Sequence, residues 1–161
     1  MFSVRVRGVD RTIRNLVKTN EGIYDSAKEG CDAAAEHLLK KIKDKFGKYN
    51  STGGDPGGYG AWKKLTPETR WKKVRKYGTD RGPLIASGKT VGSLFVKKGG
   101  KGTLAASVGV ESDYIIHHVY GAPGAHVPMR DPMRVTAKEE RDACRSIIMD
   151  YIDRAIRRSG L

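Results

Sequence analysis

Long apolar stretches are missing from this chain of 161 residues, of which 38% are hydrophobic. No stretch approaches the roughly 20 apolar residues that a membrane-spanning helix needs, and we expect no signal peptide at the start. Cysteine is scarce as well, because the chain has only Cys31 and Cys144, each among apolar residues with helical spacing. We therefore expect reduced thiols that pack in a core, and synthesis in the cytoplasm.

Catalytic and metal-binding motifs are also lacking. The sequence has no nucleophile elbow, no His-Glu-x-x-His helix and no motif of paired carboxylates. His117, His118 and His126 form the one cluster of ligand-type side chains, but neither cysteine has a nearby partner that would complete a tetrahedral zinc site. We expect no metal, no cofactor and no enzymatic activity. The remaining enzyme alternative is a nuclease built from Asp113, His117 and a basic groove.

Positive charge, in contrast, is abundant and unevenly placed. The net charge is +13, and residues 61–104 carry 12 basic and 2 acidic side chains, whereas residues 105–161 carry 8 of each. Such a concentration attracts phosphate backbones or acidic protein surfaces, unless it only keeps the protein soluble. No helix-turn-helix, zinc-finger or ribonucleoprotein motif accompanies the charge. Any contact with DNA is therefore expected to be indifferent to base sequence.

The apolar spacing in the first third predicts a strand and two helices. Alternation over Phe2–Val6 indicates a half-buried strand, and Asp10 is placed to cap a short helix. A long amphipathic helix is expected from about residue 20 to 46, with Gly47 at its end. Residues 48–60 are rich in glycine and predict a flexible loop that becomes ordered against a neighbouring subunit.

The central stretch predicts a capped helix and a short turn after it. Thr66–Glu68 supplies a capping hydroxyl, a proline for the first helical position and a carboxylate near the positive end of the dipole. Trp71 and Val74 would then share one face with Tyr77, which is the spacing of core aromatics. The Ser87-Gly88 step starts another turn, whose buried side would be formed by Val91, Leu94 and Phe95.

The last third predicts a hairpin and a second long helix. Residues 94–98 and 103–110 flank a glycine-rich turn with a strongly basic tip. Residues 114–121 fit a buried short helix or strand, and a capping box at Thr136–Glu139 starts a helix that ends near Gly160. The chain is therefore expected to form one α+β domain over residues 1–161. Its long N-terminal and C-terminal helices would pack on a small, mainly antiparallel sheet.

The order of these motifs resembles a family of tailed-bacteriophage proteins. They are the virion-morphogenesis or tail-completion proteins, also called minor tail, neck or head–tail joining proteins, and the similarity extends from about Val6 to Ile156. The first half of the pattern is Trp62, Leu65, Leu84, Ser87, Gly88 and Ser93. The second half is Tyr114, His118, Gly121, Pro128 and Arg130. The chain departs from the pattern at Lys89–Val91, where family members more often have a leucine.

The resemblance implies a non-catalytic virion protein that assembles as a ring at the head–tail junction and completes or joins the tail. Its partners would be copies of itself and neighbouring connector, tail-terminator or tail-tube proteins, with no membrane involved. The run from Gly121 to Pro132 cannot close a core alone and suits an interface between identical subunits. Lys97, Lys98 and Lys101 would face the DNA channel or an acidic partner. The alternative is a non-specific DNA-binding protein with a basic hairpin, in which tryptophans stack on bases.

Overall fold

The computed structural model describes residues 9–48, 64–80, 82–85, 87–100, 102–121, 124 and 130–159, with the backbone alone for residues 9–17. The expected strand at Phe2–Val6 lies outside these ranges, as does the expected loop after its first residue, Lys48. The described part of the chain forms six helices and one two-stranded antiparallel sheet. The predicted α+β class is confirmed, although helices make up most of the structure.

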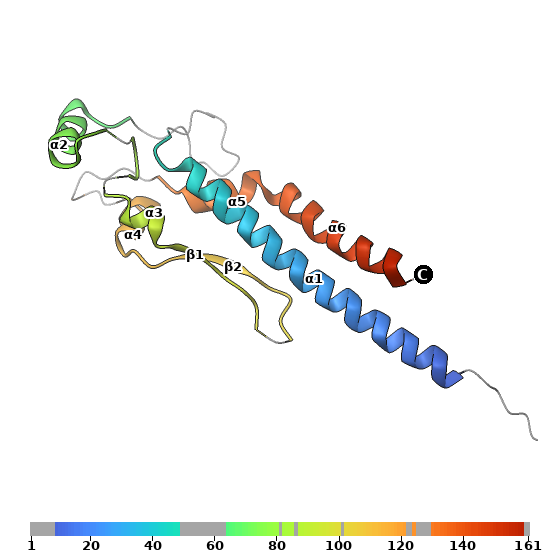
Figure 1. Cartoon of the computed structure of the whole chain (residues 1–161). Coiled ribbons are helices and arrows are strands. Elements are labelled where there is room, and N and C mark those ends of the chain that lie inside the picture. Colours follow the sequence, from blue (N-terminus) through green and yellow to red (C-terminus); the bar gives the residue numbers. More distant parts are fainter. Residues whose placement is uncertain are drawn as a thin grey trace, which may run out of the picture.

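Two long helices form the body of an elongated molecule. Helix α1 (Val9–Lys45) has 37 residues, and α6 (Arg141–Ser159) runs back alongside it in the opposite direction (Figure 1). The backbones approach closely at Gly30, where a Cβ atom would lie 3.1 Å from the Cα atom of Ile148. Glycine suits this contact, because a Cβ atom would require the backbone of α6 to move by a few tenths of an ångström.

Helix α1 corrects the expected division of the N-terminal region. We predicted a short helix capped by Asp10 and a separate helix from about residue 20, but α1 is continuous from Val9 to Lys45. Thr19, Asn20 and Gly22 lie where the two predicted helices were divided, and α1 continues through them. Each costs at most about 1 kcal/mol inside a helix, and a helix stabilised by packing further along can absorb that cost.

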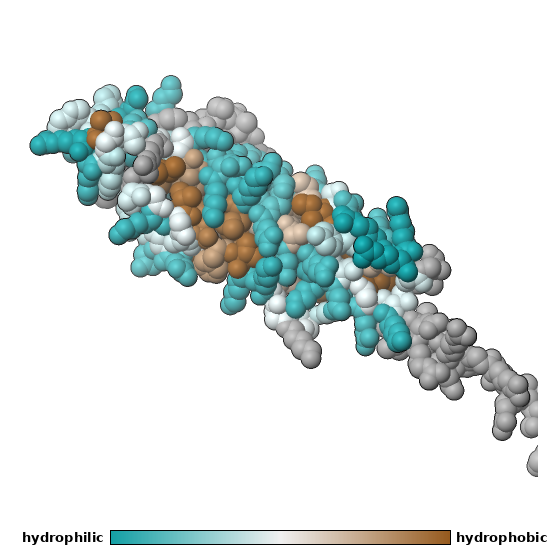
Figure 2. Space-filling model, viewed as in Figure 1, coloured by the Kyte–Doolittle hydropathy of each residue, from teal (hydrophilic) through white to brown (hydrophobic). Residues whose placement is uncertain are grey.

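The sheet packs against the C-terminal half of α1. Strand β1 (Leu94–Lys97) pairs with β2 (Ser107–Val110), and the register places Leu94 opposite Val110. The second strand is shorter than the expected residues 103–110, and Leu104, which lies outside it, is 48% exposed. Figure 2 shows hydrophilic residues over much of the visible face, with the apolar residues gathered in its middle part. The buried core cluster consists of Ile42, Phe46, Leu84, Leu94 and Ile115.

Three short helices belong to the same fold, α3 (Lys89–Gly92), α4 (Tyr114–Val119) and α5 (Pro132–Glu139). The expected capping box at Thr136 is wrong, because Thr136 is fully buried inside α5 and its hydroxyl donates to the carbonyl of Pro132 at 2.6 Å. Asp131 is the actual cap, and its Oδ1 accepts hydrogen bonds from two backbone N–H groups at 2.9 and 3.0 Å. An aspartate before a proline is the stronger start signal, since proline fits the first helical turn.

Candidate interaction surface

Helix α2 (Pro67–Tyr77) lies at one end of the molecule, apart from the α1–α6 pair (Figure 1). It begins as the sequence predicts, because the Thr66 hydroxyl accepts a hydrogen bond from the Thr69 N–H at 3.3 Å. It ends at Gly78, whose φ of 75° is left-handed and whose N–H donates to the Val74 carbonyl. Both ends are therefore capped by the helix's own sequence.

The expected burial of this helix is wrong. Trp71 is 59% exposed and Val74 is 46% exposed, and α2 contains no buried residue. The guanidinium of Arg75 lies 5.2 Å from the centre of the Trp71 ring, a cation–π contact on the surface. Spacing of three residues shows which side chains share a face. It does not show whether that face meets the protein's own core or is left open to a partner.

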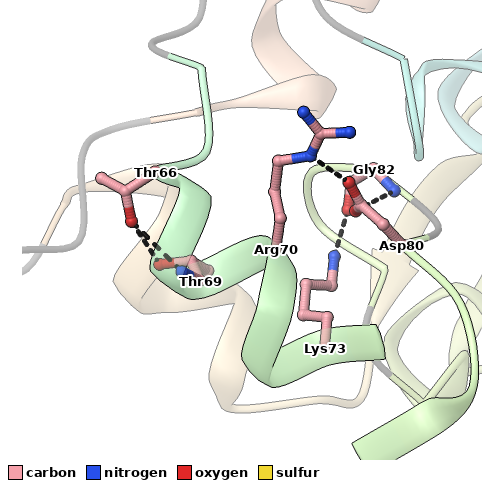
Figure 3. A network of polar contacts seen from close by, with 6 residues as sticks. All are labelled: Thr66, Thr69, Arg70, Lys73, Asp80 and Gly82. Carbon is pink, nitrogen blue, oxygen red and sulfur yellow. Dashed lines mark hydrogen bonds and ion pairs between the residues drawn. The ribbon is translucent and has the colours of Figure 1, made fainter. Parts of the chain in front are cut away.

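Polar contacts hold the inner side of α2 to the following loop (Figure 3). The Arg70 Nε donates to Asp80 Oδ2 at 2.6 Å, and the Lys73 ammonium donates to the carbonyl of Gly82. Asp80 also accepts from the Gly82 N–H at 3.1 Å, and its hydrogen bond with Arg70 holds the pKa of the carboxyl below its usual value. These contacts fix α2 without apolar burial, and they leave its opposite side uncovered.

The loop that receives α2 crosses the end of α1 at very short range. The Gly47 N–H donates to the carbonyl of Pro83 at 2.9 Å, and a Cβ atom on Gly82 would lie 2.1 Å from the Gly47 carbonyl oxygen. Next to them, Leu84 is buried with a φ of 64°, the one positive φ outside glycine among the described residues. Such a conformation costs about 1–3 kcal/mol and persists only where the surroundings impose it.

A buried corner joins α4 to the start of α5. The backbone N–H of Arg130 donates to the carbonyl of His118 at 2.6 Å, and the Tyr114 ring lies edge-on to the His118 ring at 4.9 Å. Burial lowers the pKa of His118 to about 4, helped by the charges of Arg130, His117 and Lys73. His118 is therefore neutral at pH 7. Lys73 belongs to α2, so the charge of this helix acts on the buried His118.

The described residues of the family-like pattern are mostly turn and core positions around this corner. Leu84 packs in the core with Ile115, which follows Tyr114 in α4. Leu65 and Ser93 are half-buried, and the exposed Ser87 accepts a hydrogen bond from the Lys89 N–H at 3.4 Å. Trp62 and Pro128 lie outside the described residues. Left-handed φ values explain the two glycines of the pattern, Gly88 and Gly121.

One of the two described hairpin lysines forms an ion pair within the chain. Lys97 and Lys98 are both exposed, and the Lys98 ammonium lies 3.1 Å from a carboxylate oxygen of Glu36 on α1. The hydrogen bond with Glu36 raises the pKa of Lys98, and the charges of Glu36 and Asp32 act in the same direction. Lys101 lies outside the described residues. The structure therefore turns one of the three expected contact residues toward the protein's own α1.

Sequence reasoning missed a second charged surface, on α1. Five acidic residues recur at intervals of three or four and therefore share one helix face, which we call the acidic stripe. Their spacing is a signal that the sequence alone contains, since all five lie within the long helix expected from about residue 20 to 46. The members of the stripe are Glu21, Asp25, Glu29, Asp32 and Glu36.

No group of three His, Cys, Asp or Glu side chains is close enough to hold a metal ion in the described part of the chain. His117 is exposed while His118 is buried, and His126 lies outside the described ranges. Cys31 and Cys144 are both free and half-buried, and the Cys144 thiol donates to the Ala34 carbonyl at 3.7 Å. Of the helices that the structure describes, none is long and apolar enough to cross a membrane.

Comparison with known proteins gives no match, whether to a protein-family model, to a curated protein or to a solved structure.

Proposed function

We propose that this protein is a non-catalytic structural component of a tailed-phage virion that assembles with copies of itself and helps to join the tail to the head. In this role it would act by docking, with its basic end against an acidic neighbour or near the DNA channel. The phage assignment depends on the ordered two-part pattern in the sequence. The docking role depends on the shape and the charge of the molecule.

The observation that carries the docking role is the outer side of α2. Trp71 and Val74 are exposed there on a helix with five basic residues and one acidic residue. An aromatic anchor among positive charges is typical of a surface that gains energy from a partner, since tryptophan and arginine are the residues most enriched at binding hot spots. The helix is anchored on one side and open on the other, as a docking element requires.

A second candidate function is non-specific DNA binding through the same helix. The exposed Trp71 is available for stacking on bases, and the surrounding lysines suit phosphate contacts. We assign this alternative to α2 rather than to the hairpin, because Lys98 is paired with Glu36. Contact of this kind would be weak and independent of sequence, and would fall steeply as salt rises.

Sedimentation velocity and negative-stain microscopy of the purified protein separate the two candidates. We expect oligomers of defined size, with weak DNA binding that is equal for two unrelated duplexes and lost at high salt. A protein that stays monomeric and binds one duplex tightly in high salt would contradict the structural role. Within a phage that carries the gene, its deletion should leave separate heads and tails in electron micrographs, and normal particles would contradict head–tail joining.

A further inference from the structure

We infer that the outer face of α2 in one copy docks on the acidic stripe of α1 in a second copy, so that the chains associate head to tail. This inference rests on the self-association in the proposed function and names the two surfaces that would produce it. Among the described residues, no side chain of another element forms an ion pair with Lys72, Arg75 or Lys76, nor with Glu21, Asp25 or Glu29, and the two surfaces have opposite charge. The second copy is therefore the occupant that the described residues favour.

The outer face of α2 combines charge with an apolar anchor. At 100° per residue, Arg75 and Lys72 lie on the same side of the helix as Trp71, and Val74 and Lys76 lie at the two edges of this face, which spans about 200°. Arg70 and Lys73 lie on the remaining side, where they contact Asp80 and Gly82 (Figure 3). The three outward basic residues are exposed, and only Lys72 forms an ion pair, with Glu68 of the same helix at 2.6 Å.

The acidic stripe offers the complementary surface. Glu21, Asp25 and Glu29 are exposed, and none of the ion pairs between described side chains involves them. Lys18 and Lys28 flank the stripe but leave it with an excess of negative charge. Beside it on the helix surface lies Gly22, where a Cβ atom would meet nothing within 4 Å. This opening gives a flat place for an indole ring between the carboxylates.

The other end of the stripe already binds a lysine within the same chain. Lys98 of the hairpin lies 3.1 Å from Glu36, and the charge of Asp32 contributes to the raised pKa of that lysine. A basic side chain from another element thus occupies one end of the stripe. The other three carboxylates are spaced one helical turn apart, as Asp32 and Glu36 are, and no described side chain forms an ion pair with them.

The two surfaces cannot meet in one molecule. The C-terminal end of α1, near which α2 lies, is about 30 Å along the helix from Asp25, at a rise of about 1.5 Å per residue. Figure 1 shows α2 at one end of the molecule and the N-terminal half of α1 reaching toward the other. Contact between different patches on identical chains is heterologous, and it closes into a ring or continues as a filament.

The strength of such a contact is limited by its size and by salt. A single 11-residue helix covers less area than the roughly 800 Å² per partner of a standard interface, so each contact is weak alone. Ring closure strengthens it, because the last contact forms within one assembly. Charges at the surface are screened over about 10 Å at 0.1 M salt. We therefore expect at least a tenfold loss of association between low and high salt.

A charge exchange tests the contact. The first variant carries Lys72→Glu, Arg75→Glu and Lys76→Glu, and the second carries Glu21→Lys, Asp25→Lys and Glu29→Lys. Each variant alone should lose association at least tenfold by sedimentation velocity, because both of its surfaces have the same sign. An equal mixture should associate again, since every α2 then finds a stripe of opposite charge on the other variant. Circular dichroism verifies the fold, which these exposed positions should preserve.

A matched control places the same charge change elsewhere. Lys138→Glu, Arg141→Glu and Arg145→Glu alter three exposed positions away from both surfaces and should leave association unchanged. If either exchanged variant associates alone as the wild type does, or if the mixture fails while the wild type assembles, the contact is wrong and self-assembly stands. If the wild-type protein is monomeric at low salt, both the α2–stripe contact and the proposed self-assembly are wrong. Loss of DNA binding in the first variant, with no recovery of association in the mixture, assigns α2 to DNA instead.

Discussion

A leucine placed at two glycines of α1 should have opposite effects on stability. Gly30 faces α6, where a Cβ atom would lie 3.1 Å from Ile148 Cα and 3.2 Å from Tyr151 Cβ. Gly22 lies in the same helix and is exposed, with nothing within 4 Å of such an atom. The same substitution at both positions gives the same gain in helix propensity. The difference between the two variants therefore isolates the cost of separating α1 from α6.

The expected magnitudes follow from the two environments. Gly22→Leu should stabilise the protein by roughly 0.8 kcal/mol, because glycine is a poor helix former. Gly30→Leu gains the same amount but must move two backbones apart, and overpacking of this kind costs about 1–3 kcal/mol. Since the atoms in the way belong to a backbone and a Cβ atom, we expect the upper end of this range. For a chain of this length, 3 kcal/mol corresponds to about 6–12 °C in Tm.

Thermal unfolding followed by circular dichroism in high salt, where self-association is weak, measures both variants. The wild-type Tm should lie between the two. Equal Tm values for Gly22→Leu and Gly30→Leu would show that α6 does not pack on α1 at Gly30. A pair of alanine variants provides the control, because Ala adds only the Cβ atom and should reduce the difference between the positions.

Three further outcomes test the corner and the caps. The pKa of His118 is about 4 in the folded protein and 6.5 ordinarily, so the unfolded state binds the proton more readily. The free energy of unfolding should therefore fall by on the order of 3 kcal/mol as pH drops from 6.5 to 4. In denaturant titrations, the free energy of unfolding of His118→Gln should depend less on pH. Leu84→Ala should lower the free energy of unfolding by about 2–5 kcal/mol. Leu84→Gly should be no less stable than Leu84→Ala in the same titrations, since glycine accepts a φ of 64° without strain. A glycine variant that is clearly less stable than the alanine variant would contradict the strained turn. Asp131→Ala should cost about 1–2 kcal/mol and Asp131→Asn less, because asparagine retains the capping oxygen; equal urea midpoints for the two would count against the cap.

Local signals in the sequence predicted most of the elements. The Thr66 cap, the long amphipathic pattern to Phe46 and the glycine-rich hairpin turn each specify structure within a few residues. The α+β class followed from their order. The prediction failed at α5 because a second local signal, Asp131 before Pro132, begins the helix five residues before Thr136.

The surfaces were harder to predict than the elements. Trp71 and Val74 have core spacing but stand exposed, since burial depends on whether another element covers them. Lys98 was expected to face a partner and instead pairs with Glu36, 62 positions away in the chain. No local pattern contains either fact. The sequence also left open which of the adjacent histidines is buried, and in the structure His118 is buried in the same helix as Ile115 while His117 is exposed.

Because α2 contains no buried residue, we expect it to unfold locally while the rest of the protein stays folded. An isolated helix of 11 residues is marginal in water, and its contacts to the body are the polar ones of Arg70 and Lys73. In native-state hydrogen exchange its amides should therefore exchange through local opening, long before those of α1 that face α6. A partner that binds α2 must also stabilise its folded helical form, and this lowers the net binding free energy. Substitutions that raise the helicity of α2 should tighten docking without touching the partner.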